Sequence, residues 1–298
     1  MREENNFLNI KRGYLKTDFE YFYIKDRVNL EFEPHYHDFN KIIIFISGKV
    51  TYLIEGKAYR LKPWDILLVS NNEIHKPIID SNEVYERIII WVNPLFLKKH
   101  NNTSCDLLTC FQLASSQKRN LIRLDSEHLN TIKYTSSQLN NELKNKEFGS
   151  RIVRNSLLLQ LVVYLNRLYL QTENVKEEND IEYDQRIEAI LKYINENLNQ
   201  ELTIDNLSSK FFVSKYYLMH RFKKQTGYTI HNYILQKRLI MANLQIKRGK
   251  PITEVYLECG FGDYSNFIRA FKKMFGLPPK QYYKALKELE KSYMNSNH

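Results

Sequence analysis

The sequence predicts an α+β protein of two domains, of which the first combines β-strands with helices and the second is entirely helical. Short apolar stretches separated by turn residues occupy residues 14–91, and apolar residues at helical spacing follow from residue 106 onward. Charge divides the chain similarly, because residues 184–298 hold 19 Lys and Arg against 10 Asp and Glu, whereas the remaining residues hold 25 against 24. The expected parts are a β-rich domain (1–100), a helical segment (101–172), a linker (173–183) and an all-helical domain (184–298).

The β-rich part is expected to form a closed or double-sheet architecture. Residues 41–47, 50–54, 65–69 and 84–91 are short and rich in β-branched and aromatic residues, and turn signals separate them. Many short strands at this spacing favour a barrel or two packed sheets over a parallel α/β sheet.

Histidines in this region resemble the two sequence motifs of the cupin barrel. His35 and His37 match the paired histidines of the first motif, His75 matches the histidine of the second, and Lys41 falls where metal-binding cupins have a glutamate. Three imidazoles could hold zinc, but an ammonium group beside a divalent cation is adverse and removes an anionic ligand. We therefore expect no metal, no cofactor and no catalytic residue; the alternative is a metal-dependent cupin enzyme.

Two helices are predicted after the barrel. The first spans residues 126–146, with Ser126 as its cap, and the second spans 151–171. The second is apolar on nearly all sides and must be covered on all sides. The barrel can cover one face and a second subunit another, which predicts a homodimer; the alternative is a helix buried wholly within one chain. Residues 172–180 are polar, charged and without periodicity, as in a linker.

The C-terminal part contains an internal repeat. DYSNFIRAFKKMFG, residues 263–276, has Asp263 and Gly276 as caps, and SKYYLMHRFKKQTG, residues 214–227, repeats it at an offset of 49. A short helix is expected before each, over 252–259 and after Thr203, and residues 230–247 join the two units. This pattern predicts two helix-turn-helix units on one long helix, although an ordinary amphipathic hairpin remains the alternative for one unit alone. In the second unit the apolar stripe comprises Phe267, Ile268, Phe271 and Phe275.

Residues 184–284 resemble the DNA-binding domain of AraC/XylS-type transcriptional regulators, most specifically over 252–283. The chain departs from that pattern at Tyr256, where a small residue is usual, and at His220, where a base-contacting arginine is common. The resemblance implies a cytoplasmic, sequence-specific regulator, an activator, that contacts double-stranded DNA and RNA polymerase, dimerises through the helices after the barrel, and senses a small molecule. A regulator controlled by a protein partner is an alternative, and a purely architectural DNA-binding protein is another.

The site residues follow from both resemblances. Arg269 is the first candidate for base reading, because arginine contacts guanine O6 and N7 most often, whereas the lysine pairs suit phosphates. The candidate DNA-binding residues are Ser214, Lys215, Tyr216, Met219, His220, Arg221, Lys223, Lys224, Asp263, Tyr264, Ser265, Asn266, Arg269, Lys272 and Lys273. The candidate effector-binding residues are His35, His37, Lys41, Tyr52, Trp64, His75 and Trp91, with structural histidines and core aromatics as the alternative.

Nothing in the sequence predicts export or a membrane anchor. Residues 1–10 lack the basic and apolar regions of a secretory signal, and the longest apolar run, 157–165, is far shorter than a membrane span. The three cysteines, Cys105, Cys110 and Cys259, have no metal-ligand spacing.

Overall fold

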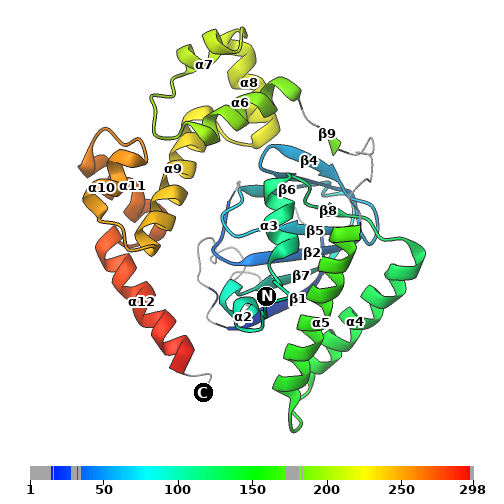
Figure 1. Cartoon of the computed structure of the whole chain (residues 1–298). Helices are drawn as coiled ribbons and strands as arrows, with labels where there is room; N and C mark the ends of the chain where they lie inside the picture. The colour runs from blue at the N-terminus through cyan, green and yellow to red at the C-terminus, as the bar shows by residue number, and fades with distance from the viewer. Residues whose placement is uncertain are drawn as a thin grey trace. The chain divides into compact units, whose positions relative to one another are not determined.

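The computed structural model describes residues 15, 17–27, 32, 35–171, 181–182 and 184–295. The chain forms two compact units, Met1–Glu182 and Tyr183–His298, coloured blue to green and yellow-green to red (Figure 1). Residues 1–10, where we expected no secretory signal, and the linker residues 172–180 lie outside the described residues. In the described part of the chain, no helix is long and apolar enough to cross a membrane.

Unit 1 is built on two antiparallel sheets. In the described residues, one sheet has the strand order β1-β7-β2-β5-β8 and the other β6-β3-β4-β9. Every pairing within them is antiparallel. The strand β9 lies within the range that we assigned to the linker and pairs with β4. The strands are β1 (Phe19–Asp26), β2 (Asn40–Ser47), β3 (Val50–Ile54), β4 (Lys57–Arg60), β5 (Ile66–Val69), β6 (His75–Ile79), β7 (Tyr85–Val92), β8 (Leu121–Ile122) and β9 (Ile181–Glu182).

The central strands of the larger sheet are apolar on both faces because they border two cores. On β2, Ile42 and Ile44 belong to the core beneath the helices, whereas Ile43 and Phe45 belong to the core between the sheets. All four are essentially buried. This explains why residues 42–46 form a continuous apolar run rather than alternating with polar residues.

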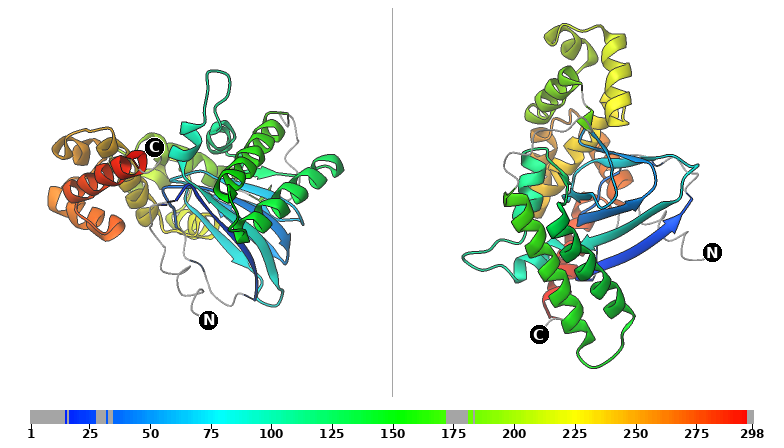
Figure 2. Two further views of the ribbon diagram at one scale, coloured as in Figure 1. Left: turned by 90° about the horizontal axis from the view of Figure 1, so that it is seen from below. Right: turned by 90° about the vertical axis from the view of Figure 1, so that its right-hand side faces the viewer.

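The described part of unit 1 also contains four helices: α2 (Pro94–Lys99), α3 (Thr109–Ser116), α4 (Ser126–Lys144) and α5 (Ser150–Gln171). Figure 2 shows α4 and α5 lying side by side along one side of the strands. The expected cap of α4 was wrong by one residue, since Asp125, not Ser126, accepts a hydrogen bond from the amide of His128 at 2.8 Å. The middle of α5 is buried in the helix-covered core, but Ile152 and Leu170 near its ends are 73% and 49% exposed.

Unit 2 contains seven helices in the described residues, and the caps predicted for its repeat are confirmed. Ser214 and Asp263 cap the N-termini of α8 and α11, and Gly227 and Gly276 end them in the left-handed conformation. The helix α9 contacts α8, α10, α11 and α12. The helices are α6 (Gln185–Glu196), α7 (Ile204–Lys210), α8 (Lys215–Thr226), α9 (Ile230–Lys247), α10 (Ile252–Glu258), α11 (Tyr264–Phe275) and α12 (Pro279–Asn295). The two-domain α+β prediction is confirmed.

The two helix-turn-helix turns differ in their left-handed residue. In the second turn this residue is Gly260, whose φ is 77°, and a Cβ there would lie 2.3 Å from the carbonyl oxygen of Leu198. Glycine is therefore required at this position. In the first turn it is Phe212, with φ 52° and a 95% exposed side chain.

Candidate functional site

The DNA-binding candidates on α8 and α11 lie on the exposed sides of these helices. On α8, Tyr216 is 77% and Met219 46% exposed, and the ring of Tyr216 stacks on His220 at a centroid distance of 6.0 Å. These three side chains form one outward surface because residues three and four apart share a helix face. The surface is aromatic and apolar rather than cationic, so any sequence readout by α8 would rest on contacts such as those to thymine methyl groups.

The outward face of α11 is more polar. Ser265, Asn266 and Arg269 are exposed, Tyr264 is 42% exposed, and the guanidinium of Arg269 donates a hydrogen bond to the side-chain oxygen of Asn266. The buried face comprises Phe267, Phe271 and Met274, with Ile268 and Phe275 partly buried; Met274 was missing from the predicted stripe.

Tyr256 is accommodated in the second unit by aromatic packing. Its ring lies 5.2 Å from that of Tyr264 and 6.4 Å from that of Phe267.

Lys272 and Lys273 occupy the last turn of α11 and are exposed, where the helix dipole favours positive charge.

Two other candidates on α8 already have partners inside unit 2. Lys215 forms an exposed ion pair with Asp205, and Arg221 pairs with Asp184 at 3.2 Å. The Arg221 guanidinium is therefore directed at a carboxylate of its own domain rather than at a DNA backbone. Burial raises the pKa of the Asp184 carboxyl, but hydrogen bonds from Tyr217, the Arg186 amide and Arg221 outweigh it, so this pKa lies below its ordinary value.

In unit 1 the structure brings most of the effector candidates together at one end of the space between the two sheets. His35 pairs with His75, at the start of β6, through two backbone hydrogen bonds of 3.0 and 2.9 Å. The His75 ring lies 4.4 Å from the His35 ring and 4.8 Å from the His37 ring. The ammonium of Lys41 on β2 donates to the Tyr52 hydroxyl on β3 at 3.5 Å. We call these five residues, His35, His37, Lys41, Tyr52 and His75, the barrel polar cluster.

Burial controls the protonation of this cluster. His37 is 7% exposed, His75 1% and Lys41 7%. Burial, followed by the charges of Lys41 and His35, holds the pKa of His37 well below its ordinary value, and burial with the same neighbours does so for His75. Burial and the nearby Arg87 lower the pKa of Lys41 to about 7.

Backbone carbonyls fix the orientation of two imidazoles. Nδ1 of His37 lies 2.6 Å from the carbonyl oxygen of Phe39, and Nδ1 of His75 lies 3.0 Å from that of Glu73. In a neutral ring Nδ1 then carries the proton and donates it, which leaves a lone pair on Nε2. Both Nε2 atoms are buried and have no hydrogen-bond partner among the described residues.

The histidines do not form a metal centre with other ligands in the described residues. No group of three or more His, Cys, Asp or Glu side chains there has an arrangement that could hold a metal ion. Lys41 occupies the position of the carboxylate that a metal-binding cupin supplies.

The two tryptophans lie in different places. Trp91 packs against Phe39 and Phe22 at 4.7 and 4.8 Å, and Phe39 stacks on His37 at 4.1 Å, so Trp91 adjoins the barrel polar cluster. Trp64 does not join it. This residue has φ 70° in a turn, and its ring packs against the helix-covered core and carries the Lys133 ammonium 4.6 Å from its centroid.

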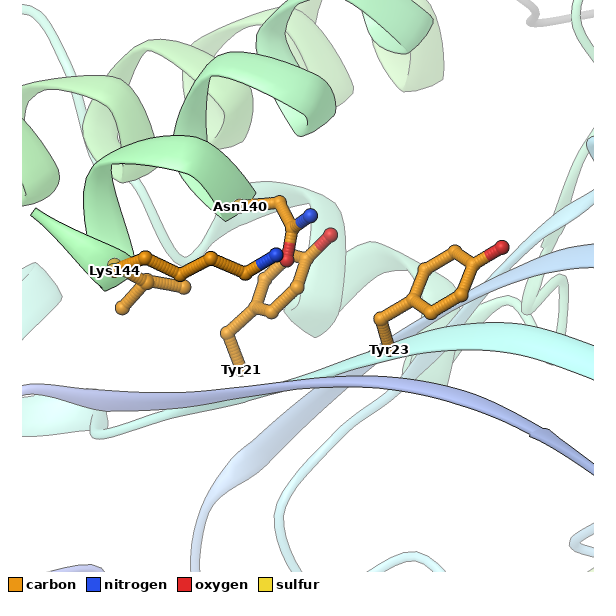
Figure 3. Close-up of a pocket in the computed structure, with 5 residues that line it drawn as sticks. Tyr21, Tyr23, Asn140 and Lys144 are labelled. Carbon is orange, nitrogen blue, oxygen red and sulfur yellow. The ribbon is translucent and has the colours of Figure 1, made fainter.

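A hollow that was not predicted from the sequence lies between β1 and α4. It has a volume of about 320 Å³ and is lined by Tyr21, Tyr23, Asn140, Leu143 and Lys144. Figure 3 shows the Asn140 and Lys144 side chains approaching the Tyr21 ring from the helix. The sequence offers one indication of this hollow, two tyrosines at alternate positions of β1, which therefore share a strand face. The lining residues on α4 lie more than a hundred residues later in the chain.

Two known protein families match the chain, one in each unit. A family described as AraC-like ligand binding domain matches residues 20–162, and one described as helix-turn-helix domain matches residues 207–285. The second match spans both repeated units that the structure places on α9. The chain belongs to the AraC family of transcriptional regulators. The family is one of regulators, so the chain is not an enzyme, and the alternative of a metal-dependent cupin enzyme is set aside.

Two relatives match the AraC-family chain over most of its length and of their own. A probable transcriptional regulator, LumQ from Photobacterium leiognathi, is 25% identical over 83% of this chain and 90% of its own length. The transcriptional activator RhaS from Citrobacter koseri is 24% identical over 84% and 86%, respectively. Among solved structures, the C-terminal domain of the response regulator yesN from Fusobacterium nucleatum is 34% identical over 34% of this chain and 99% of that one, with a TM-score of 0.32.

Proposed function

We propose that this AraC-family regulator activates transcription from specific double-stranded DNA sites that α8 and α11 recognise, under the control of a small molecule held in unit 1. The observation that carries the proposal is that α9 contacts both candidate recognition helices, each of which has an exposed face. Two helices on one connector suit successive major grooves, which lie about 34 Å apart. The net charge of +9 in residues 184–298 supports phosphate contact.

We infer different roles for the exposed residues of α11. Arg269 is placed to read a base, since its guanidinium has an exposed setting and only the Asn266 side chain accepts from it in the described contacts. Lys272 lies one turn toward the C-terminus and suits a phosphate. Asn266, beside Arg269, would orient the guanidinium for a bidentate contact with guanine.

We infer that the active form is a cytoplasmic homodimer that contacts RNA polymerase at its promoters. Support for the dimer comes from apolar side chains that the described chain leaves uncovered around the α4–α5 pair. Phe148, in the turn between the helices, is fully exposed, and Tyr134 and Ile152 are 67% and 73% exposed. Large apolar side chains with this much exposure are candidates for a protein interface.

Recovery of genomic DNA fragments by the purified full-length protein at near-physiological salt tests specific binding. A few sharp sites are expected, and binding that is diffuse and strongly salt-dependent would contradict the proposal. The recovered site then serves to compare Arg269→Ala with the matched variant Lys272→Ala. Arg269→Ala should relax preference at one base pair at a cost of about 1–3 kcal/mol, whereas Lys272→Ala should weaken all sequences alike and reduce the salt slope by about 1. Uniform weakening by Arg269→Ala would show that it does not read a base.

A further inference from the structure

The barrel polar cluster contains buried polar atoms for which the described chain provides no complement. Nε2 of His37 and Nε2 of His75 have no partner, and Lys41 has one hydrogen bond at 3.5 Å, to Tyr52. A buried polar atom left unpaired costs about as much as a lost hydrogen bond together with its desolvation. The cluster is therefore unfavourable in the empty protein, and a bound molecule would relieve this cost.

Among the described residues, no carboxylate is a named cause of the pKa shift of Lys41. The charged neighbours that shift the pKa values of Lys41, His37 and His75 are all basic. Two barrel carboxylates have other partners in the described residues. Asp26 pairs with Arg87, and one oxygen of Glu73 accepts from the Ser70 amide at 2.7 Å and from Asn120 at 3.1 Å.

The hydrogen-bonding character of these atoms restricts the ligand. Lys41 is a donor and, when charged, requires an anion, whereas the two Nε2 lone pairs require donors. A simple carboxylate would leave both imidazoles unpaired, a neutral polyol would leave the ammonium unbalanced, and a cation would be repelled by Lys41. A small anion that also carries hydrogen-bond donors satisfies all of these atoms, and a hydroxylated carboxylate is a simple molecule of this kind.

We propose that the barrel polar cluster binds a small hydroxylated carboxylate. Its carboxylate accepts hydrogen bonds from the Lys41 ammonium and the Tyr52 hydroxyl, and its hydroxyl groups donate to Nε2 of His37 and of His75. This inference rests on the proposed function, in which unit 1 holds the effector, and it names the chemical class of that effector.

Binding of such a ligand is coupled to the proton on Lys41. The titratable and charged groups around it are Arg87 on β7, Tyr52 on β3, His75 on β6 and His37 in the loop before β2. Because the pKa of Lys41 is about 7 in the empty protein, the ammonium is largely neutral above that pH. A carboxylate favours the charged form, so binding above pH 7 takes up a proton, and affinity falls by up to about tenfold for each further pH unit.

The test measures the thermal unfolding midpoint of the full-length protein with two sets of carbon-matched probes. The first set is glycerate, propionate and glycerol, and the second is gluconate, hexanoate and sorbitol. We expect glycerate or gluconate to raise the midpoint, more at pH 6.5 than at pH 8, and their deoxy and neutral counterparts to have little effect. Equal effects of propionate or glycerol, no effect of either hydroxy acid, or stabilisation by zinc instead would overturn the proposal.

Variants separate recognition from folding. Lys41→Met removes an unbalanced buried charge without reducing volume, so the empty variant should unfold at a higher temperature than the parent and should no longer respond to the acid. Lys25→Met, on an exposed lysine of β1 that pairs with Glu86, is the matched control and should keep the response. Tyr52→Phe retains the ring and should weaken the response several-fold. A destabilised Lys41→Met protein, or one that still responds, would show that Lys41 is structural.

The same preparations distinguish failure of this inference from failure of the proposed function. Parent and Lys41→Met proteins are assayed on the recovered DNA site, which α8 and α11 contact without the barrel polar cluster. Specific DNA binding without any probe response would overturn only the ligand class. Failure of the parent protein to bind any specific DNA site would overturn the proposed function.

Discussion

Asp184 joins the start of unit 2 to the first candidate recognition helix, and removing its carboxylate is the sharpest test of how α8 is held. The carboxylate caps α6 by accepting from the Arg186 amide at 3.0 Å, and it also accepts from the Tyr217 hydroxyl at 2.7 Å and from Arg221 Nε at 3.2 Å. The Asp184 amide donates to the Gln225 side chain at 3.0 Å. Tyr217, Arg221 and Gln225 are spaced by four residues, so one stripe of α8 is bound to this single position.

The cost of Asp184→Ala follows from these contacts. Loss of an N-cap costs about 1 kcal/mol. The Asp184 side chain is 14% exposed but that of Arg221 is 42% exposed, so the charge-assisted bonds are discounted for solvent to about 1 kcal/mol more. Asp184→Asn retains a good cap and should cost about half of the total of roughly 2 kcal/mol. The control is Asp205→Asn, which breaks the exposed ion pair with Lys215 and should cost less than about 0.5 kcal/mol.

The chain itself provides separate probes for the two units in a urea titration. Both tryptophans, Trp64 and Trp91, lie in unit 1, so their fluorescence follows that unit, whereas helical ellipticity also follows unit 2. Asp184→Ala should leave the fluorescence transition in place and move the unit 2 part of the ellipticity transition to lower urea by about 1 M. An unchanged ellipticity transition, or an equal shift with Asp205→Asn, would refute the assignment of Asp184 as the anchor of α8.

Two further substitutions test the turn of the first unit and the dimer. Phe212→Gly relieves a left-handed backbone conformation that costs about 1–2 kcal/mol, but the added glycine costs about 0.5–1 kcal/mol in conformational entropy. The variant should therefore stabilise unit 2 by up to about 1 kcal/mol in the same ellipticity titration. Destabilisation would show that the exposed ring makes a stabilising contact. Ile152→Asp places a charge on the exposed part of α5, where the proposed dimer contact lies. Dissociation of the dimer should halve the sedimenting mass of the full-length protein without shifting its fluorescence transition. An unchanged mass would locate the dimer contact elsewhere or exclude it.

The helices of unit 2 could be predicted from the sequence because their ends are set by local interactions. Ser214 and Asp263 bond to amides three residues further on, and Gly227 and Gly276 adopt a conformation that other residues avoid. Such signals lie within a few residues of one another, so the offset of 49 between the two units was visible without any tertiary information.

Contacts between distant residues could not be predicted in this way. Arg221 was named as a DNA-binding candidate from the family resemblance, and the carboxylate that it pairs with in unit 2 lies 37 residues earlier. Trp64 was grouped with the effector candidates because its aromatic side chain could line an apolar pocket, and the left-handed turn that directs it to the other core is not encoded by a glycine. Only the packed structure decides which of two cores receives a side chain.

The barrel polar cluster shows how a fold can keep a motif while the chemistry changes. The sequence predicted that His35, His37 and His75 would face the same space, and strand pairing brings them together. In a metal site, carbonyl groups that accept from Nδ1 orient each imidazole so that its Nε2 lone pair faces the cation. The same contacts from Nδ1 to backbone carbonyls orient His37 and His75 here. Lys41 stands in place of the anionic ligand and is a donor, so the lone pairs and the ammonium are satisfied together by a molecule that has both donor groups and negative charge. On the proposed binding mode, an amine at the position of the carboxylate suits this arrangement to an organic anion rather than to a cation.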